Sequence, residues 1–431
     1  MKKLLALCMI GVCFCGYAVF AETTVSGLFM GGVTIIGGTT EKELDDDGEE
    51  KSKKPNAGNI LAHGRIQLTS KNEEGTVGGV VRVNAKAPWY DATGIYAWGW
   101  WQPLQQIKVQ IGWHDGVFGV NNLVGWGFHA NDAEDTLDVY HGPSTDPLKL
   151  SPYEKGRFTV QTRNTGFYTG FSDVWGASLT VTPIAGLTLG FGAPYTITNW
   201  TEQDFTDAYM HFHAHASYAI GSIGKIALSY VNGKNEVAGV YGEGLDGSNL
   251  YLSFYLTAVE KLGVNIGLQY VLPAKNGDDT YYSPIVVGLG ASYALFDMFT
   301  LKVRAALQAG GKYEPNVGDS TDDPISFGLD ILPVIDFGFA KLNVNLGIEF
   351  TSEKKNANGD TVEDAAFGVG INPYLTKSIG PATIYCGVDV RSSGKKYTLT
   401  QPDPSDPDNI KVIEKEPPIV WKIPIGMAYS F

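Results

Sequence analysis

The chain has little cysteine and, after its first residues, no long hydrophobic run. Four cysteines stand among 431 residues, and three of them lie in the N-terminal apolar segment. Loss of that segment would leave Cys386 alone, so no disulfide within the chain could hold the fold. Beyond the segment, no stretch approaches the ~18 consecutive apolar residues of a membrane-spanning helix. A disulfide-stapled domain and a helical membrane protein are therefore excluded.

Basic residues and catalytic motifs are also scarce. Lys and Arg number 32 against 46 Asp and Glu, a formal net charge of −14. This acidic balance argues against nucleic acid as a partner. No nucleophile elbow, phosphate loop or HExxH helix is present. The sequence thus gives no support to an enzyme and indicates no cofactor.

Residues 1–21 have the three-part form of a secretory signal peptide. Two lysines precede an apolar run from Leu4 to Phe14, and small residues at Ala18 and Ala21 fit signal peptidase. We expect the mature chain to begin at Glu22 and to form a single domain, residues 22–431. A lipoprotein signal is the alternative, because Cys8, Cys13 and Cys15 lie in the run. The residues before them are bulkier than lipidation motifs usually have: Leu7, Val12 and Phe14.

The C-terminal segment alternates apolar and small or polar residues without a break. Its apolar positions are Ile419, Trp421, Ile423, Ile425, Met427, Tyr429 and Phe431. Successive side chains of a strand point to opposite faces. This segment therefore faces an apolar medium on one side and a polar or crowded one on the other. The same period recurs along the chain, for instance at 250–256, 264–270, 301–307, 342–350 and 384–390.

Short turns and long connections alternate between these strands. Turns are expected at 72–75, 103–106, 184–186, 221–224, 260–263, 296–299, 337–340 and 380–381. The connections between the hairpins are longer and richer in charge, such as 37–60 and 392–418. Eight hairpins, a first strand near 24–36 and the last strand give about 18 strands. The range is 16 to 20, because the segment 114–174 is treated as one connection that could hold another pair. Such asymmetry is typical of transmembrane β-barrels, whereas an array of soluble β-sandwiches would share only the average hydropathy.

The whole mature chain resembles the outer-membrane β-barrel porin class. The resemblance rests on the cleavable signal, the alternating strands and the aromatic C-terminal Phe431 with Tyr429 two places before it. It implies an all-β, up-and-down antiparallel barrel in the outer membrane, surrounded by lipid. It also implies that 425–431 is the signal read by the barrel assembly machinery. The motif Trp98-Gly99-Trp100-Trp101-Gln102-Pro103-Leu104 is similar to porin-type barrels of spirochaetes.

Charged residues in the polar phase are the candidates for lining a water-filled lumen. Near the start of the chain they form a basic arc: Arg65, Arg82, Lys86 and Lys108. The long connection after it is acidic and, as in porins, is expected to fold inward as a constriction loop; its acids include Asp132, Glu134 and Asp135. A field between arc and loop would select solutes by charge. If the loop instead lies outside, its acids form a solvated surface. Later strands add charges of both signs: Lys302, Arg304, Asp330, Glu349, Asp389 and Arg391.

Three histidines occupy one face of one strand. His211, His213 and His215 alternate with Phe212 and Ala214. Neighbouring positions on one strand face lie roughly 7 Å apart, which lets two imidazoles reach one metal ion. The spacing therefore permits a zinc or copper site. The simpler interpretation is a polar strip that responds to pH.

The preferred function is a porin for passive diffusion of small polar solutes or ions. One alternative is a channel for hydrophobic compounds, which would be expected to carry an N-terminal plug. Another is an adhesin that binds host molecules through the loops 37–60, 231–248 and 392–418. Solute, ion preference and assembly into a homo-oligomer are left open by the sequence. Cys386 is expected to face lipid or a neighbouring subunit, in phase with Ile384 and Val388.

Overall fold

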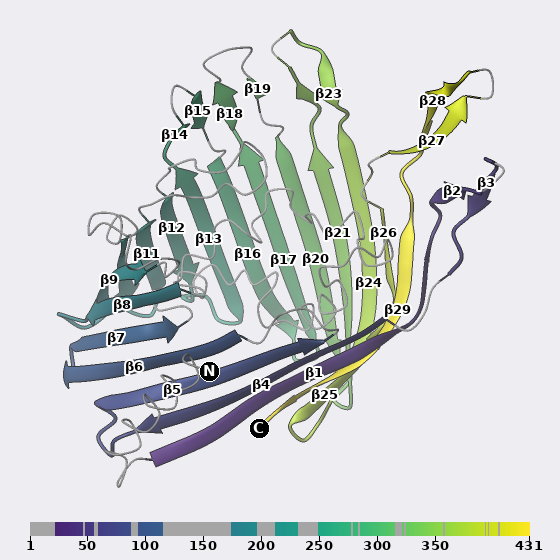
Figure 1. The fold of residues 1–431 in the computed structure, drawn as a ribbon. Helices are drawn as coiled ribbons and strands as arrows, with labels where there is room; N and C mark the ends of the chain where they lie inside the picture. The colour runs from purple at the N-terminus through teal and green to yellow at the C-terminus, as the bar shows by residue number, and fades with distance from the viewer. Residues whose placement is uncertain are drawn as a thin grey trace, which may run out of the picture.

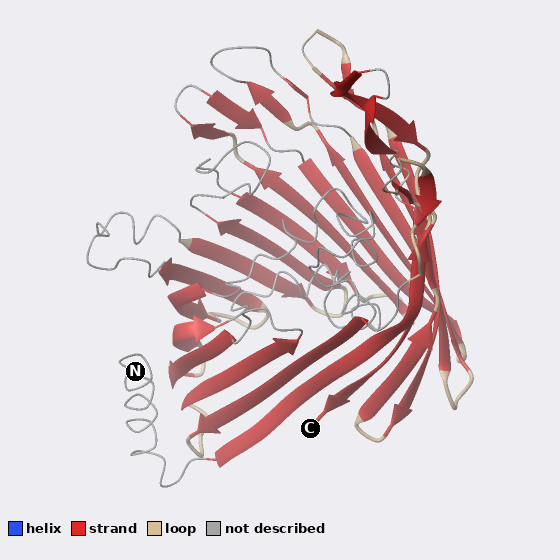
Figure 2. Cartoon of the chain, turned by 45° about the vertical axis from the view of Figure 1, so that its right-hand side comes forward, coloured by secondary structure: helices blue, strands red, loops and turns tan. Residues whose placement is uncertain are grey.

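The fold is described from a computed structural model. The structure describes residues 22–45, 48–55, 59–87, 94–114, 174–195, 212–231, 249–276, 279–282, 285–314, 321–322, 325–356, 358–392, 394, 396–403 and 406–431. Every regular element within these ranges is a strand (Figure 2). No helix in the described part is long and apolar enough to cross a membrane. The predicted signal peptide, residues 1–21, lies outside the described residues and stays a prediction.

One antiparallel sheet of 19 strands forms the body of the molecule (Figure 1). Its strands are β1 (Glu22–Thr39), β4 (Asn59–Lys71), β5 (Val77–Ala87), β6 (Gly94–Leu104), β7 (Ile107–His114), β8 (Val174–Val181), β9 (Leu187–Tyr195), β10 (His213–Ile220), β11 (Gly224–Val231), β12 (Asn249–Leu256), β13 (Leu262–Val271), β16 (Ile285–Phe296), β17 (Phe299–Ala309), β20 (Ser326–Asp336), β21 (Lys341–Thr351), β24 (Ala366–Ile379), β25 (Ala382–Gly387), β26 (Asp389–Ser392) and β29 (Val420–Ser430).

The sheet closes into a barrel. β1 pairs with β29 on one side and with β4 on the other, and β9 pairs with β10. β25 and β26 follow one another along the same position in the wall, since both pair with β24 and with β29. We call each strand position around the wall a stave and count β25 and β26 as one. The described wall then has 18 staves, within the predicted range of 16 to 20 strands. Closure removes the free edges that would otherwise pair with other chains.

The period-2 pattern determines which face looks outward. Positions of the apolar phase are exposed, for example Ile111 at 62% and Phe367 at 56%. Positions of the other phase are covered, for example Ser253 at 1% and Asn345 at 2%. Such an apolar exterior matches hydrocarbon rather than water, so the fold is that of a transmembrane β-barrel. Cys386 is exposed in the same phase as Ile384, as the sequence predicts.

All eight predicted turns connect paired strands at one end of the barrel, the turn end. The opposite, loop end carries the longer connections, several of which contain hairpins of their own (Figure 1). These are β2 (Lys42–Leu44) with β3 (Glu50–Ser52), β14 (Ala274–Asn276), β15 (Asp279–Tyr282), β18 (Lys312–Glu314) and β19 (Thr321–Asp322) in one sheet, β22 (Lys354–Lys355) with β23 (Thr361–Glu363), and β27 (Tyr397–Asp403) with β28 (Asp406–Lys415).

The first and last connections meet above the seam between β1 and β29. The backbone N–H of Lys42 donates to the hydroxyl of Tyr397 over 2.7 Å. The Lys415 ammonium pairs with Glu50. Residues more than 350 positions apart in sequence are thus joined at the loop end, where the barrel closes.

The C-terminal residue completes the seam at the turn end. Phe431 and Gly27 exchange backbone hydrogen bonds of 2.8 and 3.1 Å. The Phe431 ring lies over Gly27, where an added Cβ would come within 2.2 Å of it. Tyr429 contacts the Phe431 ring at a centroid distance of 5.9 Å. The two aromatic residues of the predicted assembly signal therefore lie together on the outer face beside the first strand.

Candidate pore lining

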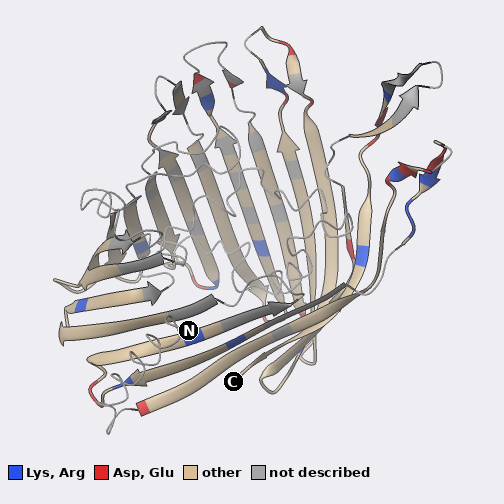
Figure 3. Cartoon of the chain, in the orientation of Figure 1, with Lys and Arg blue, Asp and Glu red and all other residues tan. Residues whose placement is uncertain are grey.

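Four basic residues of the predicted lining face the barrel interior with half-buried side chains. They are Arg65 on β4, Arg82 on β5, Lys108 on β7 and Lys302 on β17. The first three lie within the four consecutive staves β4 to β7, because β5 pairs with β4 and β6, and β6 pairs with β7. Lys302 lies on a different part of the wall. Among the described residues, Figure 3 shows single charges along the strands and groups of them on the hairpins of the loop end.

Arg82 is held by a neighbour on each side. Its Nε donates to the side-chain oxygen of Gln67 over 2.9 Å, and Gln67 is its direct partner across β4 and β5. The guanidinium lies over the ring of Trp98, with its Cζ 5.3 Å from the ring centroid. A cation over an indole face is attracted by the negative charge of the ring's π face. The head group is thus held in place on the inner wall.

Lys108 repeats this arrangement two residues further along β6. Its ammonium lies 5.5 Å from the centroid of the Trp100 ring. The indole lies over Gly78, where an added Cβ would approach it to 2.2 Å, and its Nε1–H donates to the carbonyl of Gly75 over 3.2 Å. Only a residue without a side chain leaves room for the ring against the wall. Trp98 and Trp100 were not predicted as lining, because three aromatic residues within four positions obscure the alternation of β6.

The inner wall at β24 to β29 is arranged differently, because its polar groups are buried. Asp389 and Lys422 are direct partners between β26 and β29, 3% and 6% exposed, and their charged groups are 4.0 Å apart. Lys422 is a member of this wall that the sequence-based list of lining residues missed. Because both groups are covered, we interpret them as stabilising the wall and not as contacting a solute.

Amides and a tyrosine are also covered on this part of the wall. Asn345 and Asn372 oppose each other on β21 and β24, and Asn372 donates to the carbonyl of Val388, the residue between β25 and β26, over 3.1 Å. Tyr385 is 2% exposed and donates from its hydroxyl to the carbonyl of Gly31 over 3.3 Å. The polar groups of this part of the inner surface are therefore buried within the wall.

Other predicted lining residues are placed only by their backbone or not at all. Register sets Arg304 opposite Asp330, a pairing of opposite charges between β17 and β20, and Glu349 opposite Gly368. The side chains of Lys86, Arg304, Asp330, Glu349 and Arg391 lie outside the described part. The predicted constriction acids Asp132, Glu134 and Asp135 lie in 115–173, also outside it. In the described wall, β7 pairs directly with β8.

Of the three histidines, His215 has a described side chain. It is buried in the inner wall of β10, and its Nδ1 lies 2.7 Å from the hydroxyl of Ser229 on β11. His211 and the side chain of His213 lie outside the described part. Among the described residues, no group of three or more His, Cys, Asp or Glu is arranged to hold a metal ion. Metal binding by this strip remains a prediction.

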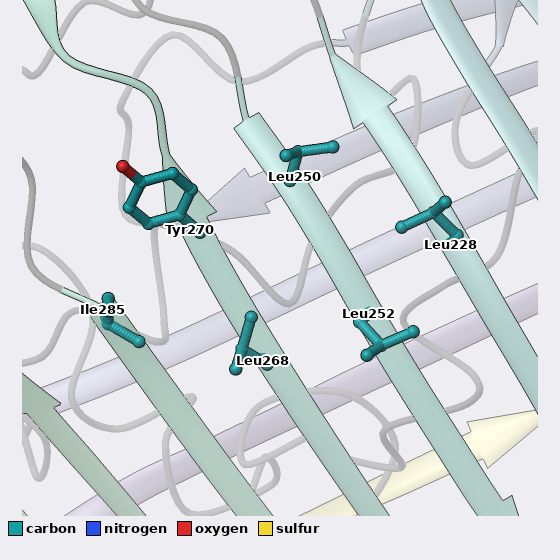
Figure 4. A pocket seen from close by; sticks show the side chains of 6 residues that line it. All are labelled: Leu228, Leu250, Leu252, Leu268, Tyr270 and Ile285. Atoms are coloured by element: carbon teal, nitrogen blue, oxygen red, sulfur yellow. The ribbon is translucent and has the colours of Figure 1, made fainter.

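An apolar hollow of about 360 Å³ lies on the outer face of β11 to β16. Figure 4 shows the six side chains that line it: Leu228, Leu250, Leu252, Leu268, Tyr270 and Ile285. All belong to the outward phase of their strands. The hollow therefore belongs to the lipid-facing surface and is no part of an interior path.

Comparisons with known proteins agree with the architecture. No protein-family model matches the chain, and no curated protein matches it. Among solved structures, Pseudomonas aeruginosa OpdQ is 9% identical over 95% of this chain and 98% of its own, with a TM-score of 0.51. OpdL, from the same organism, is 12% identical over 95% and 98%, with a TM-score of 0.50. OccK3 (OpdO) is 12% identical over 95% of both chains, again at 0.50. At such identities the likeness establishes the fold of an outer-membrane barrel.

Proposed function

We propose that this protein is an outer-membrane porin through which small polar solutes and ions diffuse passively. The observation that carries the proposal is the closed barrel of 18 staves in the described part of the chain, whose outward phase is apolar and whose inward phase holds the polar and charged side chains. Barrels of this stave number leave an aqueous lumen. The outward phase contacts lipid. Transport then needs no bond making and no cofactor, since the path is water.

Charge selection would arise on one side of the wall. Arg65, Arg82 and Lys108 lie within the four consecutive staves β4 to β7 and have half-buried side chains. Cations held near the path raise the local concentration of anions and lower that of cations. We expect the pore to favour anions, with the predicted constriction acids at 115–173 narrowing it if that segment folds inward.

Two further proposals concern delivery and the loop end. Export through the signal peptide 1–21 and recognition of Tyr429 and Phe431 by the barrel assembly machinery would place the barrel in the outer membrane with the loop end outside. Binding of host molecules would then fall on the paired hairpins β2–β3 and β27–β28. Their mutual contacts support one continuous surface there in place of two separate loops.

Single-channel recording tests the function. The refolded mature protein is inserted into a planar bilayer under a salt gradient, and conductance and reversal potential are read. Stepwise open channels that prefer anions are expected. Arg82→Gln should move the reversal potential toward zero, while Lys377→Gln, on the exposed outer face of β24, should leave it unchanged. A folded barrel that never conducts would refute the proposal.

A further inference from the structure

Two cation–aromatic pairs lie side by side on the inner wall of β5, β6 and β7. Arg82 covers Trp98, and Lys108 covers Trp100. Trp98 and Trp100 are next neighbours on one face of β6, roughly 7 Å apart by the strand rise. The four side chains, named here the cation–indole strip, therefore form one band across three staves with a cation at each end.

We propose that the cation–indole strip is a binding site for small planar aromatic anions, such as aromatic carboxylates, on their way through the pore. The proposal rests on the proposed function for its place in transport. An aromatic carboxylate carries a negative head and a flat ring. The strip offers a cation for the head and an indole for the ring.

The strip is built in advance of any ligand. Trp100 is held against Gly78 and by its bond to Gly75, and Arg82 is held by Gln67. Side chains fixed in this way lose little conformational freedom when a solute binds. All four side chains of the strip are half-buried and reachable from the interior, in contrast to the covered pair of Asp389 and Lys422.

The chemistry also predicts what the strip would reject. A saturated ring carboxylate has the same charge but no π face, and a neutral aromatic has the π face but no charge. Each should bind more weakly than benzoate. A contact between two aromatic rings contributes enough for up to roughly a tenfold change in affinity.

Binding is tested by titration calorimetry on the refolded full-length mature barrel in detergent. The probes are benzoate, cyclohexanecarboxylate and benzyl alcohol. We expect benzoate to bind about tenfold more tightly than either of the others. Trp98→Leu with Trp100→Leu should abolish that preference while keeping apolar bulk. Trp101→Leu is the matched control, because Trp101 is on the same strand but 56% exposed on the outer face.

Equal binding of benzoate and cyclohexanecarboxylate by the unaltered barrel would overturn the strip as a site. A benzoate preference that survives the double substitution would do so too. Circular dichroism and heat-modifiable migration on gels establish that the variant is folded. Arg82→Gln, which keeps both indoles, serves as a second test, because it should weaken both carboxylates and leave benzyl alcohol unchanged. Conductance is recorded separately. A barrel that binds benzoate but never conducts would refute the porin and leave the site standing.

Discussion

The two sides of the barrel interior use polar residues in different ways. On β5 to β7 the cations and indoles of the cation–indole strip are half-buried and face the lumen. On β21 to β29 most of the inward polar side chains are covered, and they include the charged pair of Asp389 and Lys422. An inward-pointing charge is therefore not by itself a pore-lining charge. The degree of burial distinguishes polar groups that can contact a solute from polar groups that stabilise the wall.

The largest effect should follow from breaking the covered pair. Asp389→Leu leaves the Lys422 ammonium facing a methyl-bearing side chain in a site that is almost closed to water. Removing one partner of a buried ion pair costs about 3 kcal/mol in the free energy of unfolding. Urea titration of the barrel in detergent or lipid measures it, with tryptophan fluorescence as the signal.

The matched variant is the double substitution Asp389→Leu with Lys422→Met. It removes both charges, so most of the lost stability should return. If the double variant is less stable than the single one by the full cost of Lys422→Met alone, the two residues act independently and the wall is not held by this pair.

The seam where the two sides join should be next in sensitivity. Gly27→Val places a side chain where the Phe431 ring lies, within 2.2 Å of an added Cβ. Displacing the ring should cost about 2 kcal/mol, the usual range for overpacking. The midpoint of urea unfolding reports it. Gly64→Val is the control, since nothing lies within 4 Å of an added Cβ there. Equal effects of both substitutions would mean that the seam is not specifically packed.

A smaller difference in stability is expected between substitutions of the two facing amides of the covered wall, Asn345 and Asn372. Asn372 donates to the carbonyl of Val388, whereas the side-chain oxygen of Asn345 has no hydrogen-bond partner among the described residues. Asn372→Leu should therefore cost about 1 kcal/mol more than Asn345→Leu, because it leaves the carbonyl at the break between β25 and β26 unpaired. Unfolding free energies of the two variants decide this, and the reverse order would contradict it.

The outline of the barrel could be predicted because lipid exposure imposes alternation on every stave. The turns at 221–224 and 260–263 and the outward phase of Cys386 followed from that alternation alone. The inward orientation of the Trp98 and Trp100 side chains could not be predicted, because aromatic residues on both faces of β6 obscure the alternation of apolar and polar residues. The pair of Asp389 and Lys422 could not either. Its members are 33 positions apart, and they meet only because β26 continues on β29 in the register that β25 has already set.

Exposed ion pairs at the loop end should matter least. Lys312 and Glu314 on β18 are 2.6 Å apart and about 40% exposed, in contrast to the covered pair of Asp389 and Lys422. The hydrogen bond from Lys312 holds the pKa of Glu314 below its ordinary value. A lowered carboxyl pKa contributes stability above the unfolded pKa, and that contribution is lost as pH falls through the folded pKa. Below roughly pH 4 the free energy of unfolding falls as Glu314 takes up a proton. Lys312→Gln should therefore make this fall only slightly smaller. Unfolding curves at several acidic pH values measure this. A change as large as that of Asp389→Leu would mean that exposure does not distinguish the two kinds of pair.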